Sequence, residues 1–331
     1  ELWRSDGTEA GTVMVKDINP GTAGNNILDY AVMGDNLYFQ AGSNVHGSEL
    51  WKTDGTESGT VMVKDINSVC PNPSCTTTDG SSPQYLVAAG ETLYFRADDG
   101  THGKELWKSD GTESGTVMVK DIAPDGASSN PLYFTAIGDL VFFRAQGSDE
   151  NGNVGGLWRS DGTEAGTIAL TSSPYDPNGL KAIGDTLFFR FKDTNANGTE
   201  MWRSDGTVAG TEMIDLTPDP YRSSNSFGFT LLGSTVYFSA DNALGNAPGA
   251  TGLELHAHDP TNITLDAPPP ASWRAEPALP AGISISGGTI SGTPSVYASN
   301  QTYTIYAEQG AMATTFEIYL SVGSENPHTV V

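Results

Sequence analysis

One short unit returns five times along the chain and constrains the fold more than any other feature. Three copies are nearly identical: "ELWRSDGTEAGTVMVKDIN" begins at Glu1, "ELWKTDGTESGTVMVKDIN" at Glu49 and "ELWKSDGTESGTVMVKDIA" at Glu105. Two looser copies follow, "GLWRSDGTEAGTIAL" at Gly156 and "EMWRSDGTVAGTEMIDL" at Glu200. Self-similarity at a period of roughly 45 to 55 residues indicates one supersecondary unit that is repeated along the chain.

Each repeat reads as four short strands. An aromatic run after Gly-acid, such as "GDNLYFQA" or "GETLYFRA", precedes each "ELW", and a shorter apolar run such as "ILDYAV" or "QYLVAA" precedes that. The turn "DGTESGT" leads from the "ELW" strand to the "TVMVKDI" strand, because Asp54 can bond its own backbone and Gly55 can adopt positive φ. Gly59 adds a second flexible point.

The pattern predicts an all-β fold. The aromatic runs are continuously apolar rather than alternating, which fits sheets that are buried on both faces. A four-stranded unit at this period is typical of propeller blades, where neighbouring blades cover each other. We therefore expect a roughly six-bladed β-propeller over residues 1–260.

Tryptophan supports this interpretation. Five of the six tryptophans occupy one repeat position, where a large ring would fill the wedge between blades: Trp3, Trp51, Trp107, Trp158 and Trp202. A sixth unit has decayed to "LELHAHD", with His256 in place of tryptophan, and terminal repeats are often atypical.

The "ELWxxDGTxxGT" unit resembles the ELW-repeat β-propeller-like proteins of bacteria and archaea, over about residues 1–260. That resemblance implies a propeller fold and a secreted or cell-surface setting, and it supplies no catalytic residues.

A second domain is expected over residues 261–323, after a stiff "APPPA" spacer. Its "LPAGISISGGTISGTP" stretch resembles the Ig-like domains of large bacterial surface proteins, which carry LPxGL followed by GxISGTP. Ile283 stands where leucine is usual. Two later runs, "TYTIYAEQ" and "TTFEIYLSV", alternate as half-buried sandwich strands do. Residues 324–331 read as a linker, or as a strand offered to another molecule.

The net charge limits the kinds of binding partner, and the cysteines indicate the redox compartment. The chain of 331 residues carries a formal net charge of −24, which disfavours nucleic acids and anionic membrane surfaces. Its apolar runs stay well short of the roughly 20 residues of a membrane helix. Cys70 and Cys75 in "CPNPSC" predict a local disulfide, which suits an oxidising compartment, with free thiols as the alternative. Sequons permit glycosylation at Asn197, Asn262 and Asn300.

Two loops carry the spacing of calcium ligands. Oxygen-bearing residues at alternate positions before glycine match the start of a calcium loop, and hard oxygen ligands favour Ca²⁺ over zinc. In the fifth repeat these residues are Asp193, Asn195 and Asn197, with Glu200 following; in the fourth they are Asp149, Asn151 and Asn153. The alternative is an ordinary polar turn, which uses the same residues.

Catalytic chemistry is not indicated. His46 and His102 precede "ELW" at equivalent positions, which makes them loop elements first. His256 and His258 could share one strand face and bind zinc, but the sequence places no further ligands there. "RSDGTEAGT" superficially resembles the Asp-box of sialidase propellers, but its spacing differs. We therefore expect that the protein is not an enzyme.

The functional hypothesis is an extracellular structural protein that assembles into a filament or surface layer. The alternative is a secreted carbohydrate-binding or adhesion propeller. A glycosidase-type enzyme is a weaker alternative. Near-identical blades favour the first, because propeller enzymes draw different residues from different blades. The chain also begins on the third strand of a repeat. An upstream segment, ring closure between the ends, or strand exchange with a neighbouring copy would complete that blade.

Overall fold

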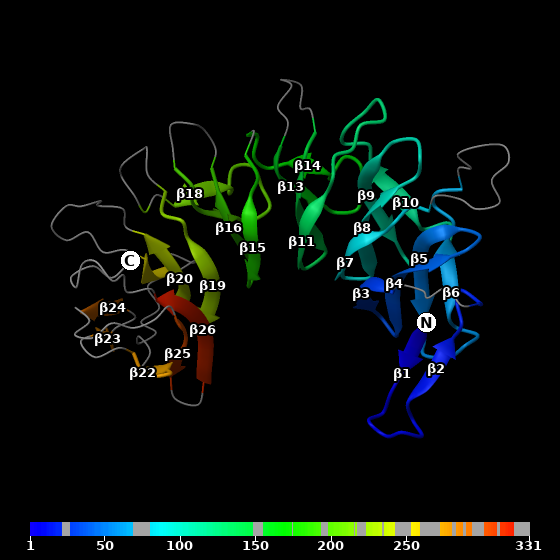
Figure 1. Ribbon diagram of the computed structural model, residues 1–331. Helices are drawn as coiled ribbons and strands as arrows, with labels where there is room; N and C mark the ends of the chain where they lie inside the picture. Colours follow the sequence, from blue (N-terminus) through cyan, green and yellow to red (C-terminus); the bar gives the residue numbers. More distant parts are fainter. Residues whose placement is uncertain are drawn as a thin grey trace. The chain divides into compact units, whose positions relative to one another are not determined.

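The computed structural model describes most of the chain (Figure 1). The described ranges are 1–21, 27–68, 80–147, 155–173, 175–192, 198–214, 216, 223–233, 235–241, 253–258, 272–279, 283–286, 289–292, 301–309 and 312–320. All regular elements within these ranges are β-strands, and helix is absent from them. The chain divides into two compact units, residues 1–185 with 206–211, and residues 186–205 with 212–331.

The first unit contains a two-stranded sheet followed by three complete four-stranded sheets, in which consecutive strands pair antiparallel. The two-stranded sheet is β1 (Leu2–Arg4) and β2 (Val13–Lys16). The four-stranded sheets are β3 (Leu28–Met33), β4 (Asn36–Ser43), β5 (Gly47–Thr53) and β6 (Val61–Lys64); β7 (Gln84–Ala89), β8 (Thr92–Asp98), β9 (Lys104–Ser109) and β10 (Val117–Lys120); and β11 (Leu132–Ile137), β12 (Leu140–Ala145), β13 (Gly156–Ser160) and β14 (Ile168–Ala169). Strand β15 (Asn178–Ile183) follows.

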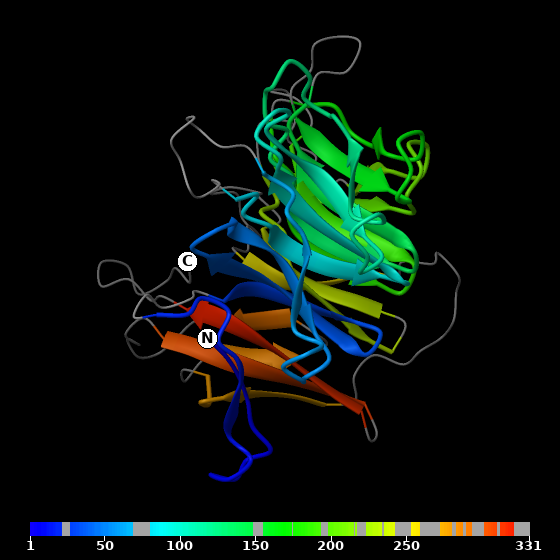
Figure 2. The same cartoon turned by 90° about the vertical axis from the view of Figure 1, so that its right-hand side faces the viewer.

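The second unit is also built of antiparallel strands. Its sheets are β16 (Thr186–Phe191), β17 (Glu200–Ser204) and β18 (Glu212–Ile214); β19 (Phe227–Leu232), β20 (Thr235–Asp241) and β21 (Leu253–His258); β22 (Ser272–Glu276), β25 (Gln301–Gln309) and β26 (Met312–Leu320); and β23 (Ile283–Ser286) with β24 (Thr289–Gly292). The long pair β25 and β26 runs side by side in both views (Figures 1 and 2).

The predicted four-stranded antiparallel repeat is confirmed, and its register is constant. The aromatic strand pairs with the "ELW" strand so that phenylalanine faces tryptophan in four repeats: Phe39 with Trp51, Phe95 with Trp107, Phe143 with Trp158, and Phe189 with Trp202. The four phenylalanines are fully buried. The same strand pairing therefore recurs because each repeat has the same residue types at equivalent positions.

Three of the five tryptophans, all in the first unit, lie between neighbouring sheets as predicted, whereas Trp3 is exposed. Trp51 joins a buried cluster with Leu2, Val15 and Ile18 of the preceding repeat. Trp107 packs in the same way with Leu50, Val63 and Ile66, and Trp158 with Leu106, Val119 and Ile122. The core of this unit thus consists of successive layers between sheets, which is why both faces of the central strands are apolar.

Candidate functional site at the seams between repeats

The turn after each "ELW" strand is closed by its aspartate. In the second repeat, Asp54 Oδ1 accepts hydrogen bonds from the Thr56 amide (2.8 Å) and the Thr56 hydroxyl (2.7 Å). The Thr56 hydroxyl accepts from the Gly59 amide (2.9 Å). The side-chain bond from Thr56, followed by the backbone bond, lowers the pKa of Asp54. The same bonds lower the pKa of its counterparts in other repeats, Asp6, Asp110 and Asp161.

The two glycines of the turn are needed for different reasons. Gly55 has φ +86°, which confirms the predicted positive φ. Gly59 was expected to add flexibility, but it is instead fixed by a close approach. A Cβ atom at Gly59 would lie 2.1 Å from Asp54 Oδ1, and the equivalent glycines of three other repeats are equally crowded: Gly11, Gly115 and Gly166. Glycine is therefore required because the aspartate side chain folds over it.

Three of the turns are held by cations of the preceding repeat. Lys16 Nζ donates to Thr60 O (2.8 Å), and Arg4 donates to Gly55 O (3.2 Å). The next seams repeat this arrangement: Lys64 to Thr116 O (2.8 Å), Lys52 to Gly111 O (2.8 Å), Lys120 to Thr167 O (3.0 Å), and Lys108 to Gly162 O (2.7 Å). The contact has a direction, because donors come from one repeat and acceptor carbonyls from the next.

A tyrosine of the aromatic strand completes two of these seams. Tyr38 lies against Gly111 of the next repeat, and Tyr94 lies against Gly162. A Cβ atom at Gly111 would be 2.2 Å from the Tyr38 hydroxyl oxygen, and one at Gly162 would be 2.7 Å from that of Tyr94. Burial, with the nearby carboxylates of Asp161 and Asp139, raises the pKa of Tyr94 to about 12. The phenol therefore stays neutral and serves as packing.

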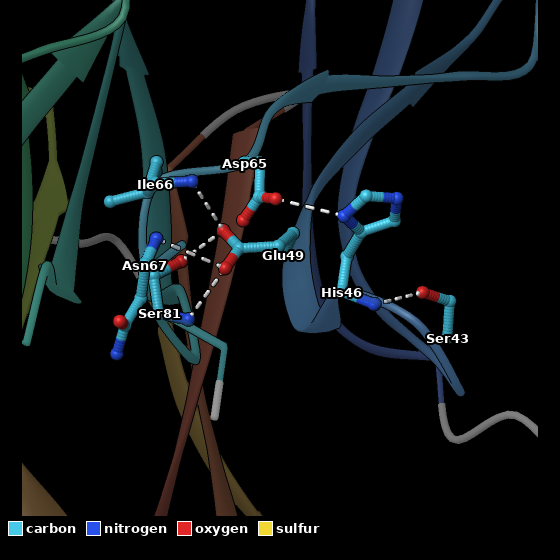
Figure 3. A network of polar contacts seen from close by, with 7 residues as sticks. All are labelled: Ser43, His46, Glu49, Asp65, Ile66, Asn67 and Ser81. Atoms are coloured by element: carbon cyan, nitrogen blue, oxygen red, sulfur yellow. Dashed lines mark hydrogen bonds and ion pairs between the residues drawn. The ribbon is translucent and has the colours of Figure 1, made fainter. Parts of the chain in front are cut away.

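The glutamate of "ELW" is a buried clasp between repeats (Figure 3). The fully buried carboxylate of Glu49 accepts from the amides of Ile66 (3.1 Å), Asn67 (3.3 Å) and Ser81 (2.8 Å), and from the Ser81 hydroxyl. Ile66 and Asn67 follow the outer strand of the same repeat, whereas Ser81 leads into the next repeat. Burial raises the pKa of Glu49, although these hydrogen bonds oppose the shift.

The clasp recurs in other repeats. Glu105 accepts from the amides of Ile122 (3.0 Å) and Ser129 (2.8 Å), and burial again raises its pKa. Glu1 accepts from the amide of Ile18 (2.6 Å). Sequence reasoning missed this role. The available signal was a glutamate in the middle of a strand predicted to be buried, since such residues are rarely buried without partners.

The fourth repeat replaces the clasp, because Gly156 stands where glutamate is usual. A Cβ atom at Gly156 would lie 2.4 Å from Thr171 O, so this repeat cannot hold a side chain there. The hydroxyl of Thr171 accepts from the Leu157 amide (2.9 Å). Arg144 also forms a two-pronged ion pair with Asp176, with both distances 2.7 Å. Different residues thus tie the same segments together.

The two equivalent histidines pair with aspartates. His46 Nδ1 lies 2.8 Å from Asp65 Oδ2, and His102 Nδ1 lies 2.7 Å from Asp99 Oδ2. The hydrogen bond to Asp99 raises the pKa of His102. Both histidines therefore bind side chains of nearby loops and turns. His256 and His258 lie in β21.

Most residues predicted to bind calcium lie outside the described residues: Asp149, Asn151, Asn153, Asp193, Asn195 and Asn197. Glu200 is described; it is buried and accepts from the Ser224 amide (3.0 Å), as expected of a clasp residue. In the described part of the chain, no group of three or more His, Cys, Asp or Glu residues could hold a metal. Calcium binding stays a prediction. Cys70, Cys75, Asn262 and Asn300 also lie outside the described residues.

Comparisons with known proteins give a likeness of fold only. No protein-family model matches the chain, and no curated protein matches it. Among solved structures, a mutant of puromycin hydrolase is 12% identical, with a TM-score of 0.42, and the match covers 76% of this chain but 39% of that one. Prolyl oligopeptidase B from Galerina marginata is 10% identical, with a TM-score of 0.43 and coverage of 89% and 42%. The β-propeller domain of the Trilobed protease from Pyrococcus furiosus is 8% identical, with a TM-score of 0.41 and coverage of 90% and 84%.

The chain therefore spans about two fifths of the length of the first two enzymes.

Within the described residues, no helix is long and apolar enough to cross a membrane. The chain is an all-β protein of repeated four-stranded antiparallel sheets, and one of its structural neighbours is a β-propeller domain.

Proposed function

We propose that this chain is a non-enzymatic extracellular structural protein whose copies assemble into a filament or surface layer. In this proposal, residues 1–260 form a roughly six-bladed propeller of the ELW-repeat type. Residues 261–323 form an Ig-like sandwich, and residues 324–331 form a tail. The observation that carries the proposal is the directional seam, in which lysines of one repeat bind carbonyls of the next.

A directional seam favours open assembly. Each repeat offers two different complementary faces, so a contact of the same kind between copies is head to tail. Head-to-tail contacts that do not close produce filaments. The recurring polar residues also make structural hydrogen bonds at these seams. The aspartates close turns, the glutamates join neighbouring repeats and the lysines bind carbonyls. This use supports a structural role over a catalytic one.

The extracellular setting rests on composition and on the ELW-repeat resemblance. A net charge of −24 leaves nucleic acid as an unsuitable partner. A Cys70–Cys75 disulfide and Ca²⁺ held around Asp193 and Asp149 would both suit the outside of a cell.

Trp3 provides a test of self-assembly. Its counterpart Trp51 is buried against Leu2, Val15 and Ile18 of the neighbouring repeat, whereas Trp3 is 59% exposed. In this proposal a second copy covers Trp3 with the equivalent leucine, valine and isoleucine. We expect the intact chain to form polymers in sedimentation and electron microscopy, and Trp3→Ala to prevent them without lowering the melting temperature.

Trp51→Ala is the matched control, because removing a buried tryptophan should destabilise the fold by roughly 3 kcal/mol or more. A chain that stays monomeric at high concentration, or a Trp3→Ala variant that polymerises normally, would overturn the proposal.

A second candidate function is carbohydrate binding or adhesion. One observation favours it: exposed tyrosines lie on the first strands of two repeats, Tyr85 on β7 and Tyr133 on β11.

A further inference from the structure

The first strand of each repeat contains a bulge at its second residue. Pairing with the next strand shifts register there in β3, β7, β11 and β19. The residue at this position has positive φ in the five strands β3, β7, β11, β15 and β19: Asp29 (49°), Tyr85 (60°), Tyr133 (59°), Gly179 (65°) and Gly228 (73°). The fold therefore requires a left-handed residue at the bulge, whatever its side chain.

Two repeats use tyrosine where others use glycine. Glycine adopts positive φ without steric cost, whereas a bulky side chain is an outlier there. Gly179 and Gly228 show that the backbone alone is satisfied by glycine. The residues Tyr85 and Tyr133 are 39% and 48% exposed, so burial of the side chain offsets only part of the steric cost. Strained residues that persist in this way cluster at binding and catalytic sites.

The surroundings of Tyr85 fix its ring. The Arg96 guanidinium lies over the ring, 4.8 Å from its centroid, and donates to Gln84 Oε1. The ring of Phe134, on the neighbouring strand β11, stacks at 6.5 Å with an interplanar angle of 21°. Asp29, at the bulge of β3, accepts from the amides of Tyr85 and Leu86.

The strands that carry these residues are neighbours, because β3 contacts β7 and β7 contacts β11. The result is a row of residues in which Tyr85 and Phe134 stack, edged by the Arg96 guanidinium, the Gln84 amide and the Asp29 carboxylate, while Tyr133 occupies the equivalent bulge position on β11.

We infer that this row, centred on Tyr85, Tyr133 and Phe134, binds a neutral oligosaccharide. A pyranose ring offers an apolar C–H face to an aromatic ring and hydroxyl groups around its edge. The planar guanidinium of Arg96 and the amide of Gln84 suit pairs of hydroxyls, which a proline-rich peptide would not offer. Equivalent tyrosines in successive repeats suit a ligand that is itself a chain. This ligand class deepens the second candidate function, carbohydrate binding, on which the inference rests, and it is independent of the proposed self-assembly.

The bulge makes an unusually clean test possible. Tyr85→Gly with Tyr133→Gly removes both rings and also relieves the strained backbone, so the variant should fold with a melting temperature at or above that of the wild type. The probes are cellohexaose, chitohexaose and mannohexaose, titrated by NMR at millimolar concentration. We expect at least one to bind, and the double glycine variant to bind it about tenfold or more weakly.

Phe227→Ala is the control, because Phe227 is 43% exposed and precedes a bulge rather than occupying it; it should bind like the wild type. Binding by none of the three probes would overturn the inference, as would unchanged binding by the double variant. A proline-rich peptide that binds at these tyrosines in place of every sugar would also overturn it.

Discussion

Ser81 donates both its amide and its hydroxyl to the buried carboxylate of Glu49, which lies 32 positions earlier in the chain. The same carboxylate accepts the amides of Ile66 and Asn67. One side chain thus joins the end of its own repeat to the beginning of the next. This clasp gives the glutamate of the "ELW" motif a physical role.

Glu49→Ala should be among the most destabilising single changes. It leaves the buried amides of Ile66, Asn67 and Ser81 without their acceptor, and each unsatisfied buried group costs about 1–3 kcal/mol. Ser81→Ala removes one donor and should cost about 1 kcal/mol. Urea unfolding of both variants measures the difference. A Glu49→Ala variant as stable as Ser81→Ala would show that the clasp contributes little.

The clasp also predicts a pH dependence. Burial raises the folded-state pKa of Glu49 and Glu105, so the folded protein binds protons more tightly there than the unfolded chain does. Their titration therefore favours folding fully below the unfolded pKa of 4.5, and this contribution is lost as the pH rises through the folded values.

The turn aspartates act in the opposite sense. The lowered pKa of Asp54 and Asp110 gives stability above the unfolded value of 3.8, and this is lost as the pH falls through the folded values. Glu49→Gln with Glu105→Gln should remove only the decline above pH 4.5. Thermal unfolding from pH 3 to pH 8 checks this, and parallel curves for variant and wild type would contradict it.

Gly59→Ala should act through Asp54. The new methyl group would meet the aspartate carboxylate and break the bonds to Thr56. We expect a loss of roughly 1–3 kcal/mol. In an Asp54→Ala background the same change should cost clearly less, because the two effects share one cause. Additive losses in this double-mutant cycle would refute the close-contact explanation.

Calcium removal tests the loop prediction. If Asp193 and Asn195 bind Ca²⁺, chelation should lower the melting temperature, because a ligand bound only by the folded state stabilises it. An Asp193→Ala, Asn195→Ala variant should melt at the chelated wild-type temperature with or without calcium. An unchanged wild-type melting curve in EDTA at low ionic strength would leave these residues as turn formers.

The strands and turns could be predicted from the sequence because residues close together in the chain determine them. The strand pair around Phe39 and Trp51, and the turn at Asp54 and Gly55, follow from apolar runs and turn chemistry within a few residues. The partners of Glu49 could not be predicted, since they are 17 to 32 residues away.

Two further features had weaker signals. The sequence predicts Glu200 as a calcium ligand, because it follows oxygen-bearing residues in one loop; its hydrogen bond with the Ser224 amide depends on the next repeat. The bulge at Tyr85 has a signal only when repeats are aligned, where Gly179 and Gly228 occupy the same position.

Hydrogen exchange in a Glu105→Ala variant tests most directly whether the clasp couples neighbouring repeats. Glu105 holds the amide of Ile122 in its own repeat and that of Ser129 at the start of the next. Mass spectrometry should show lost protection in β9 and β10 together with β11 and β12, whereas Lys104→Ala, at an exposed site, should exchange like the wild type. Loss confined to the residues beside position 105, with β11 and β12 as protected as before, would contradict the account.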